Sequence, residues 1–340
     1  MAVKAFISGC AGTALDAGER AFFAEEQPLG LILFKRNCET RDQVRALISD
    51  FRGAVGRADA PVMIDQEGGR VRRLRPPEWP AYPSARVHGD LAVRDSAAAV
   101  RAAWLHGRLM GADLADLGIT IDCAPVLDVI VPGASEAIGD RSFGGDPTTV
   151  TLLGRAMADG LAAAGVAPVI KHIPGQGRAV VDSHDTLPVV DTDLDTLMAT
   201  DFAPFVALAD LPAAMTSHTV FSAVDARPAT TSPTLIRDII RERIGFDGLL
   251  FSDDVSMNAL AGNHAERGKA IFDAGCDIVL HCSGLMDDMR QIAGVAPALA
   301  GKAAVRVERM LALAGTPEPF DRAAGREEFL ALLGDGWVGS

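Results

Sequence analysis

The sequence predicts an α/β fold, a single (β/α)8, TIM-like barrel that spans residues 1–340 as one domain. Short apolar runs rich in β-branched residues alternate with longer amphipathic segments, which is typical of parallel strands joined by crossover helices. Eight such units can be counted, and eight parallel strands close into a barrel whose interior is filled by side chains. A chain of 340 residues with 49% hydrophobic content suits one large core.

The predicted elements follow one another in a regular order. Strands are expected at residues 5–8, 31–34, 62–64, 119–123, 168–171, 213–216, 249–252 and 278–281. Helices are expected over residues 41–51, 97–117, 148–164, 194–208, 233–244 and 264–274. Thr40 and Asp193 stand where a side-chain oxygen caps a first turn, and Gly275 stands where a helix ends in the left-handed region. Residues 315–340 are predicted to form a turn and a C-terminal helix packed on the barrel.

Charge and missing motifs exclude several classes of protein. The 32 basic and 45 acidic side chains give a net charge of −13, which repels phosphate backbones and anionic lipid, so neither nucleic acid nor a membrane is an expected partner. No run reaches the roughly 18 apolar residues of a membrane span, and the N-terminus lacks a signal-type segment, so a cytoplasmic protein is expected. The competing fold, an open doubly wound sheet, is disfavoured because no Gly-x-Gly-x-x-Gly turn follows the first strand.

Polar side chains follow nearly every predicted strand at the point where the strand ends. They are Lys35 and Arg36, Asp65 to Glu67, Asp122 and Asp128, Lys171 and His172, Ser217 and His218, Asp253 and Asp254, and His281. Catalytic residues of barrel enzymes come from these carboxyl ends, so the pattern predicts a polar cleft for a hydroxyl-rich ligand. For any single residue, ordinary loop solvation is an equally good explanation.

The segment after the fifth strand carries a second candidate pair. Pro174, Gly175 and Gly177 exclude a helix, so a long loop is expected. Asp182 and His184 are two residues apart and can share a hydrogen bond on one side of an extended segment. A carboxylate beside an imidazole favours the charged ring and orients it, as a proton donor near neutral pH requires. A solvated ion pair of no catalytic role is the alternative.

Five motifs carry a family resemblance over most of the chain. They are IDQEGGRVRR at 64–73, IGDRSF at 138–143, KHIPGQG at 171–177, DSH at 182–184 and FSDDVSM at 251–257. Together and in this order they resemble glycoside hydrolase family 3, in particular its single-domain bacterial β-N-acetylglucosaminidases (β-hexosaminidases) of peptidoglycan recycling. The chain departs from the family's usual pattern at two positions, where Ile173 replaces an aromatic residue and Gln176 a second histidine.

The resemblance implies a role for each matching residue. It implies that Asp253 is the nucleophile of a retaining glycosidase and that His184 is the acid/base, assisted by Asp182. It further implies that the sugar is held by Asp65, Arg73, Arg141, Lys171 and His172. No cofactor and no metal are expected, because the histidines His172, His184, His218 and His281 lie on separate elements without a tight ligand spacing.

The implied substrate is a small carbohydrate, a muropeptide fragment in which GlcNAc is joined to anhydro-N-acetylmuramic acid, with or without peptide. The enzyme would remove the terminal, non-reducing GlcNAc through a covalent glycosyl-enzyme. Two alternatives stay open: a β-N-acetylglucosaminide phosphorylase, in which phosphate accepts the sugar, and a catalytically retired sugar-binding barrel. A monomer is expected.

Overall fold

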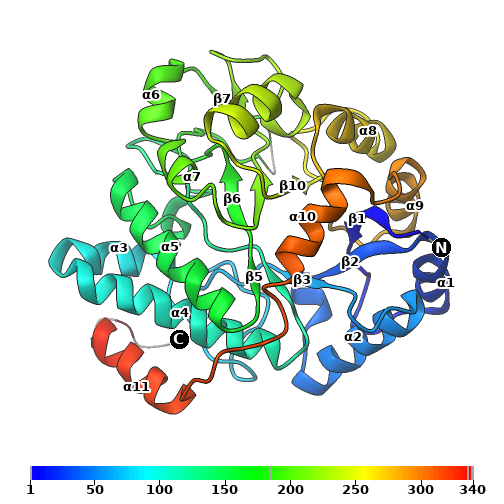
Figure 1. The fold of residues 1–340 in the computed structure, drawn as a ribbon, viewed down its shortest axis with the longest axis horizontal. Coiled ribbons are helices and arrows are strands. Elements are labelled where there is room, and N and C mark those ends of the chain that lie inside the picture. Colours follow the sequence, from blue (N-terminus) through cyan, green and yellow to red (C-terminus); the bar gives the residue numbers. More distant parts are fainter. Residues whose placement is uncertain (1, 184–185, 335–336, 338–340) are drawn as a thin grey trace.

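The computed structural model of the protein is a barrel of parallel strands surrounded by helices (Figure 1). It describes residues 2–183, 186–334 and 337. The barrel strands are β1 (Lys4–Ser8), β2 (Pro28–Leu33), β3 (Val62–Ile64), β4 (Ile121–Asp122), β5 (Ala167–Pro168), β6 (Ile170–Ile173), β8 (Ala213–Thr216), β10 (Leu249–Asp254) and β11 (Ile278–His281). Each of the eight runs predicted from the sequence overlaps one or two of these strands.

The barrel closes because the first and last strands in the hydrogen-bonded order, β5 and β6, follow one another directly in the sequence. The hydrogen-bonded order is β5-β4-β3-β2-β1-β11-β10-β8-β6. Strand β5 pairs with β4, strand β6 pairs with β8, and only Val169 separates β5 from β6. Val169 donates its backbone N–H to the carbonyl oxygen of Asp122, which continues the pairing on the β4 side. The nine segments of the described chain thus act as eight strands, and the predicted (β/α)8 barrel is confirmed.

Helices surround the strands in the described part of the chain (Figure 1). They are α1 (Ala17–Glu26), α2 (Arg41–Val55), α3 (Ala85–Arg94), α4 (Ser96–Ala115), α5 (Pro147–Ala163), α6 (Leu194–Ala199), α7 (Ala203–Ala207), the π-helix η4 (Leu235–Arg243), α8 (His264–Ala274), α9 (Met286–Val295), α10 (Gly301–Leu311) and α11 (Arg322–Leu333). Thr40 and Asp193 cap α2 and α6 as predicted, and Gly275 ends α8 at a φ of 104°.

The prediction of one helix over residues 194–208 is wrong. Helix α6 ends at Ala199, and α7 begins only at Ala203. Thr200 leaves the helical region with φ −123° and ψ −79°. Pro204 has no N–H to donate to an earlier turn, so a continuous helix would lose a hydrogen bond there. The interruption leaves room for Asp201, whose buried carboxylate accepts a hydrogen bond from Arg178 at 2.8 Å.

The amino ends of the strands are sealed by apolar packing. Interior side chains such as Ala5, Leu29 and Leu249 form a buried cluster that includes Val307 and Met310 of α10. Helix α10 passes in front of the strands in Figure 1, across the middle of the molecule. Burying these apolar surfaces stabilises the barrel and excludes water from that end. An opening for a ligand is therefore left at the carboxyl ends.

The long loop after β6 is tied down by a second, two-stranded sheet. Strand β7 (Val189–Val190) pairs in parallel with β9 (Val220–Phe221), which follows β8. The loop that starts at Pro174 therefore returns to a fixed position beside the next unit of the barrel. Its middle part, 178–183 as described, is consequently held at both ends near the carboxyl ends of the strands.

The C-terminal helix α11 lies along α4. Arg101 of α4 donates to Glu328 at 2.7 Å, and Arg322 pairs with Asp116 at 2.6 Å. Phe329 of α11 is fully buried. The assignment of residues 1–340 to a single domain stays a prediction. Among the described helices, none combines the length and the apolar character that a membrane crossing needs.

Candidate active site

A polar cavity of about 220 Å³ opens at the carboxyl ends of the strands. Seven of the eight site residues expected from the sequence line it: Asp65, Arg73, Arg141, Lys171, His172, Asp182 and Asp253. The eighth, His184, lies outside the described residues, while its neighbour Ser183 lines the cavity. The remaining wall is partly apolar and includes Phe34, Met215 and Met257. Residues far apart in the sequence thus meet at one pocket, as the strand-end pattern predicts.

Two adjacent aspartates at the end of β10 have different surroundings. The carboxylate of Asp254 accepts backbone N–H groups of Ser256 at 3.0 Å and Cys282 at 3.2 Å, and burial raises its pKa. Asp254 is therefore committed to holding the β10 and β11 loops together. Asp253 accepts the N–H of Asp254 at 2.8 Å through one oxygen, Oδ1, and faces the cavity. Both side chains line the cavity, but the Asp254 carboxylate is engaged by backbone N–H groups of two loops, so these contacts favour Asp253 as the reactive group.

Two carboxylates and three cations form a charged network at the cavity, and all of them except Glu67 line it. Lys171 donates to Asp65 at 2.9 Å and lies 2.6 Å from Glu67. Asp65 also pairs with Arg73 at 2.9 Å, and Glu67 with Arg141 at 2.8 Å. Groups held this way by charge-assisted bonds have little rotational freedom. A rigid rim of donors and acceptors of this kind suits the hydroxyl groups of a sugar.

The network controls the protonation of its own members. Burial raises the pKa of Asp65 and Glu67, but the neighbouring cations outweigh it, so Asp65 titrates well below its usual range and Glu67 at about 2. Burial lowers the pKa of Lys171, but the two carboxylates outweigh it and raise that pKa above its ordinary value. All three groups are consequently charged at neutral pH.

The Glu67→Gln variant is expected to lose stability in a pH-dependent way. Since the folded-state pKa of Glu67 lies below its ordinary value of 4.5, its contribution is complete above pH 4.5 and is lost as pH falls toward about 2. Urea unfolding should therefore show the largest gap between wild type and variant above pH 5 and a shrinking gap below. Exposed Glu25→Gln is the control, with an expected change under about 0.5 kcal/mol throughout. A gap that widens toward acid would contradict this assignment.

His172 is oriented by a carboxylate that the sequence analysis left without a role. Asp128 accepts a hydrogen bond from His172 Nδ1 at 2.7 Å, and its other oxygen accepts the backbone N–H of Gln176 at 2.7 Å. Nε2 of His172 lies 3.4 Å from Arg141 Nη2 and faces the cavity. Asp128 is fully buried and acts by fixing the ring and the start of the following loop.

The side chain of Gln176 links the loop to the barrel. Its Nε2 donates to Ser183 Oγ at 3.1 Å, and its Oε1 accepts from Ser217 Oγ at 3.2 Å. Ser183 adjoins Asp182, so this glutamine holds the segment that carries the predicted acid/base pair. The position at which the chain departs from the expected histidine thus keeps a two-sided hydrogen-bonding function.

Glu67 and Asp128 are not among the residues that line the cavity, and sequence reasoning missed their supporting roles behind Arg141 and His172. Both belong to the polar groups at strand ends, but nothing in the sequence shows that Glu67 meets Arg141 or that Asp128 meets His172. Other strand-end residues prove structural. Arg36 donates to the carbonyl of Cys10, and His218 bridges Thr230 and the carbonyl of Asp254.

Comparison with known sequences decides the family. The profile of the Glycosyl hydrolase family 3 N terminal domain matches residues 10–311. The chain belongs to glycosyl hydrolase family 3. As a family 3 member it is a glycoside hydrolase, and the resemblance predicted from the five motifs is confirmed. The beta-hexosaminidase of Methylococcus capsulatus is 42% identical over 276 residues, which is 80% of each chain. That of Bordetella avium is 37% identical over 295 residues, covering 85% of this chain and 83% of the relative.

Solved structures of family 3 share the whole fold. NagZ from Neisseria gonorrhoeae, in complex with N-trifluoroacetyl-D-glucosamine, superposes with a TM-score of 0.85 at 31% identity. The match covers 98% of this chain and 97% of that one. The family 3 barrel found here is therefore nearly coextensive with that of a single-barrel relative, and the beta-hexosaminidase group within the family is the one it resembles.

Proposed function

We propose that the protein is a retaining β-N-acetylglucosaminidase that removes a terminal, non-reducing GlcNAc through a covalent intermediate on Asp253. The observation that carries the proposal is that Asp253 and Asp182 line one cavity together with the Asp65, Lys171 and Arg73 network. The names of the relatives and the glucosamine derivative in the NagZ complex support the same substrate class.

The proposed reaction has two displacements at the anomeric carbon. In the first, a carboxylate oxygen of Asp253 bonds to C1, the glycosidic C–O bond breaks, and His184 gives its proton to the departing oxygen. In the second, His184 takes a proton from water, the water oxygen bonds to C1, and the bond to Asp253 breaks. Asp182 stabilises the imidazolium, as an orienting carboxylate does in a triad. Two inversions give net retention.

The dimensions of the cavity support a single sugar in the pocket. At about 220 Å³ it lies below the roughly 300 Å³ at which sites for drug-sized ligands begin, so one ring fits better than an oligosaccharide. We further propose that the natural substrate is GlcNAc joined to anhydro-N-acetylmuramic acid, with or without peptide, in the cytoplasm. A monomer with no nucleic-acid or membrane partner is part of this proposal, in keeping with the net charge of −13.

The test is hydrolysis of nitrophenyl N-acetyl-β-glucosaminide with detection of the anomer first released. We expect nitrophenol release and β-GlcNAc as the first product, visible by proton NMR before mutarotation. An α-anomer would contradict the double displacement. Formation of GlcNAc 1-phosphate in phosphate buffer would indicate a phosphorylase, and GlcNAc binding without turnover would indicate a retired barrel.

Replacing Gln176 with alanine is expected to lower kcat by about 10- to 100-fold, because a small misplacement of the segment around Ser183 costs that much in proton transfer. Gln176→His, which restores a ring nitrogen at this position, should recover part of the loss. The matched control is Gln43→Ala, which removes hydrogen bonds to the carbonyls of Thr13 and Asn37 away from the cavity. Steady-state kinetics that show equal kcat for both alanine variants would rule out a positioning role for Gln176.

A further inference from the structure

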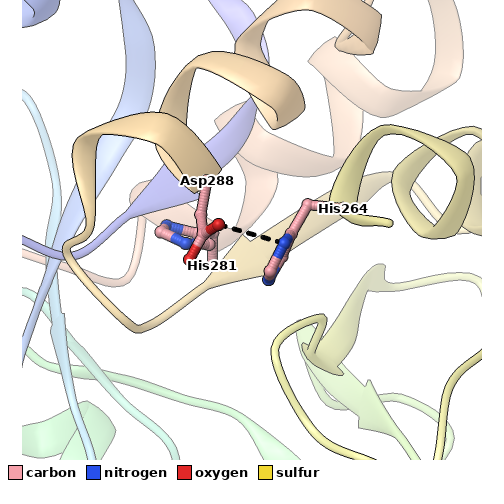
Figure 2. A group of neighbouring side chains, drawn as sticks. All are labelled: His264, His281 and Asp288. Atoms are coloured by element: carbon pink, nitrogen blue, oxygen red, sulfur yellow. Dashed lines mark ion pairs between the residues drawn. The ribbon is translucent and has the colours of Figure 1, made fainter. Parts of the chain in front are cut away.

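A second cluster of ligating side chains lies beside the cavity, and the sequence analysis did not anticipate it. His281 ends β11, His264 begins α8, and Asp288 lies in the first turn of α9. Figure 2 shows the Asp288 carboxylate between the two imidazole rings. Among the described residues these three form one group in which a ligand atom from each lies within 4.8 Å of the other two.

The spacing of the cluster is close to that of a zinc site. Ligand atoms about 2.0–2.1 Å from a tetrahedral zinc ion are roughly 3.3 Å apart. His264 Nδ1 and Asp288 Oδ1 are 3.2 Å apart, which already matches this separation. The remaining separations are at most 4.8 Å, so zinc binding requires them to shorten by up to about 1.5 Å.

The hydrogen bonding of the cluster is incomplete. His264 Nε2 and His281 Nδ1 are buried and have no hydrogen-bond partner among the described residues. His281 is fully buried, and its Nε2 meets Ser283 Oγ at 2.9 Å. A buried ring nitrogen without a partner costs about 1–3 kcal/mol. His264 Nδ1 is the ring nitrogen next to Asp288, so a metal bound there would leave the unpartnered Nε2 unchanged, and the feature that favours a cation is the spacing and chemical type of the three ligand groups.

We propose that His264, His281 and Asp288 bind a divalent transition-metal ion, with zinc the best match. Two imidazoles and one carboxylate form a borderline set that suits zinc better than magnesium or calcium, which prefer oxygen ligands. Three protein ligands leave a fourth position, and Ser283 Oγ, 3.2 Å from Asp288 Oδ2, is positioned to hold a water there. The site revises the expectation that the chain has no metal set.

The metal connects three elements next to the reactive end of the barrel. It joins the start of α8, the end of β11 and the start of α9. Cys282, which follows His281, lines the cavity and donates its N–H to Asp254. Bound metal therefore stabilises the loop framework around Asp254 without touching the sugar. Its effect is on stability, and the chemistry at Asp253 does not require it.

The experiment is calorimetric titration of the chelator-treated, full-length protein with ZnCl₂, repeated with CoCl₂ and visible spectroscopy. We expect one equivalent of zinc, a tetrahedral cobalt spectrum and a rise in the midpoint of thermal unfolding. Asp288→Asn should weaken binding about 100-fold or more, since it removes a charged ligand. Its matched control is Asp287→Asn, which makes the same change at the exposed neighbour in the same turn and should bind as wild type does.

Two further variants keep the result unambiguous. His264→Ala removes a partly exposed ligand and should also abolish the binding of zinc. The conclusion therefore does not depend on the Asp288→Asn variant alone folding correctly. Asp253→Ala, a change in the sugar cavity, should still bind one equivalent of zinc. The proposal is overturned if no zinc binds, if Asp288→Asn and Asp287→Asn bind equally, or if Asp253→Ala alone loses the metal. Failure of the metal site leaves nitrophenol release, and thus the proposed activity, unaffected.

Discussion

Replacing Asp253 with alanine is expected to reduce kcat for a nitrophenyl N-acetyl-β-glucosaminide by about 10⁴-fold or more, because no covalent intermediate can then form. The substitution removes a partly exposed carboxylate at a strand end, so thermal unfolding should change little. Sodium azide provides a readout that a structural role would not affect. The azide ion can occupy the space of the lost carboxylate, attack C1 and restore turnover with an α-glycosyl azide as product.

The neighbouring aspartate is the internal control. Asp254→Asn keeps an oxygen that accepts the N–H groups of Ser256 and Cys282, so it should reduce kcat far less and gain nothing from azide. If Asp254→Asn proves the more damaging change, or if azide rescues it and fails with Asp253→Ala, the nucleophile is misassigned. Both variants are read with the same substrate, which needs no protonation of its leaving group.

The barrel itself could be predicted because its physics is repetitive. Strands that are buried on both sides appear in the sequence as short, continuous apolar runs, and the helices between them appear as segments in which apolar residues recur with a 3.6-residue period. Helix α10 was not predicted, and its position over the strands could not have been predicted from the sequence. Its sequence is that of an ordinary amphipathic helix, and only the packing of Val307 and Met310 on the strand interior shows that it seals one end. The helix break before Ala203 could have been predicted from Pro204, which has no backbone N–H to donate, whereas the contact of Asp201 with Arg178 at the break is tertiary.

The sequence predicts which residues form the candidate site, but it does not predict which of them contact one another. The strand-end rule and the family motifs together give Asp65, Lys171, His172 and Asp253, all of which line one cavity. Which of these side chains pair with one another depends on distances across the barrel that no local pattern encodes. Asp128 beside His172 is one example, and the contact bridges 44 positions of sequence. The His264 cluster is another, since its three members come from three different elements.

The largest expected effect on stability comes from Lys171→Met. Lys171 is 2% exposed and lies between Asp65, whose side chain is 15% exposed, and the buried Glu67, so its removal leaves these two carboxylates with one fewer cation. Breaking a buried ion pair from one side costs about 3–5 kcal/mol. Urea unfolding at neutral pH should show a loss of that size. Sugar binding should weaken as well, because the two carboxylates lose the cation that orients them.

We expect Lys171→Met to lose stability because the charges of Asp65 and Glu67 are no longer compensated. Two comparisons separate this effect from others. Lys269→Met breaks an exposed Lys–Asp pair at 2.6 Å, for which about 0.5 kcal/mol or less is expected. The double variant Lys171→Met/Glu67→Gln removes one carboxylate along with the cation and should be more stable than the sum of the single losses predicts. If the two single changes simply add, the carboxylates do not depend on Lys171 for their ionised state, and the network acts as separate Asp65–Arg73 and Glu67–Arg141 pairs.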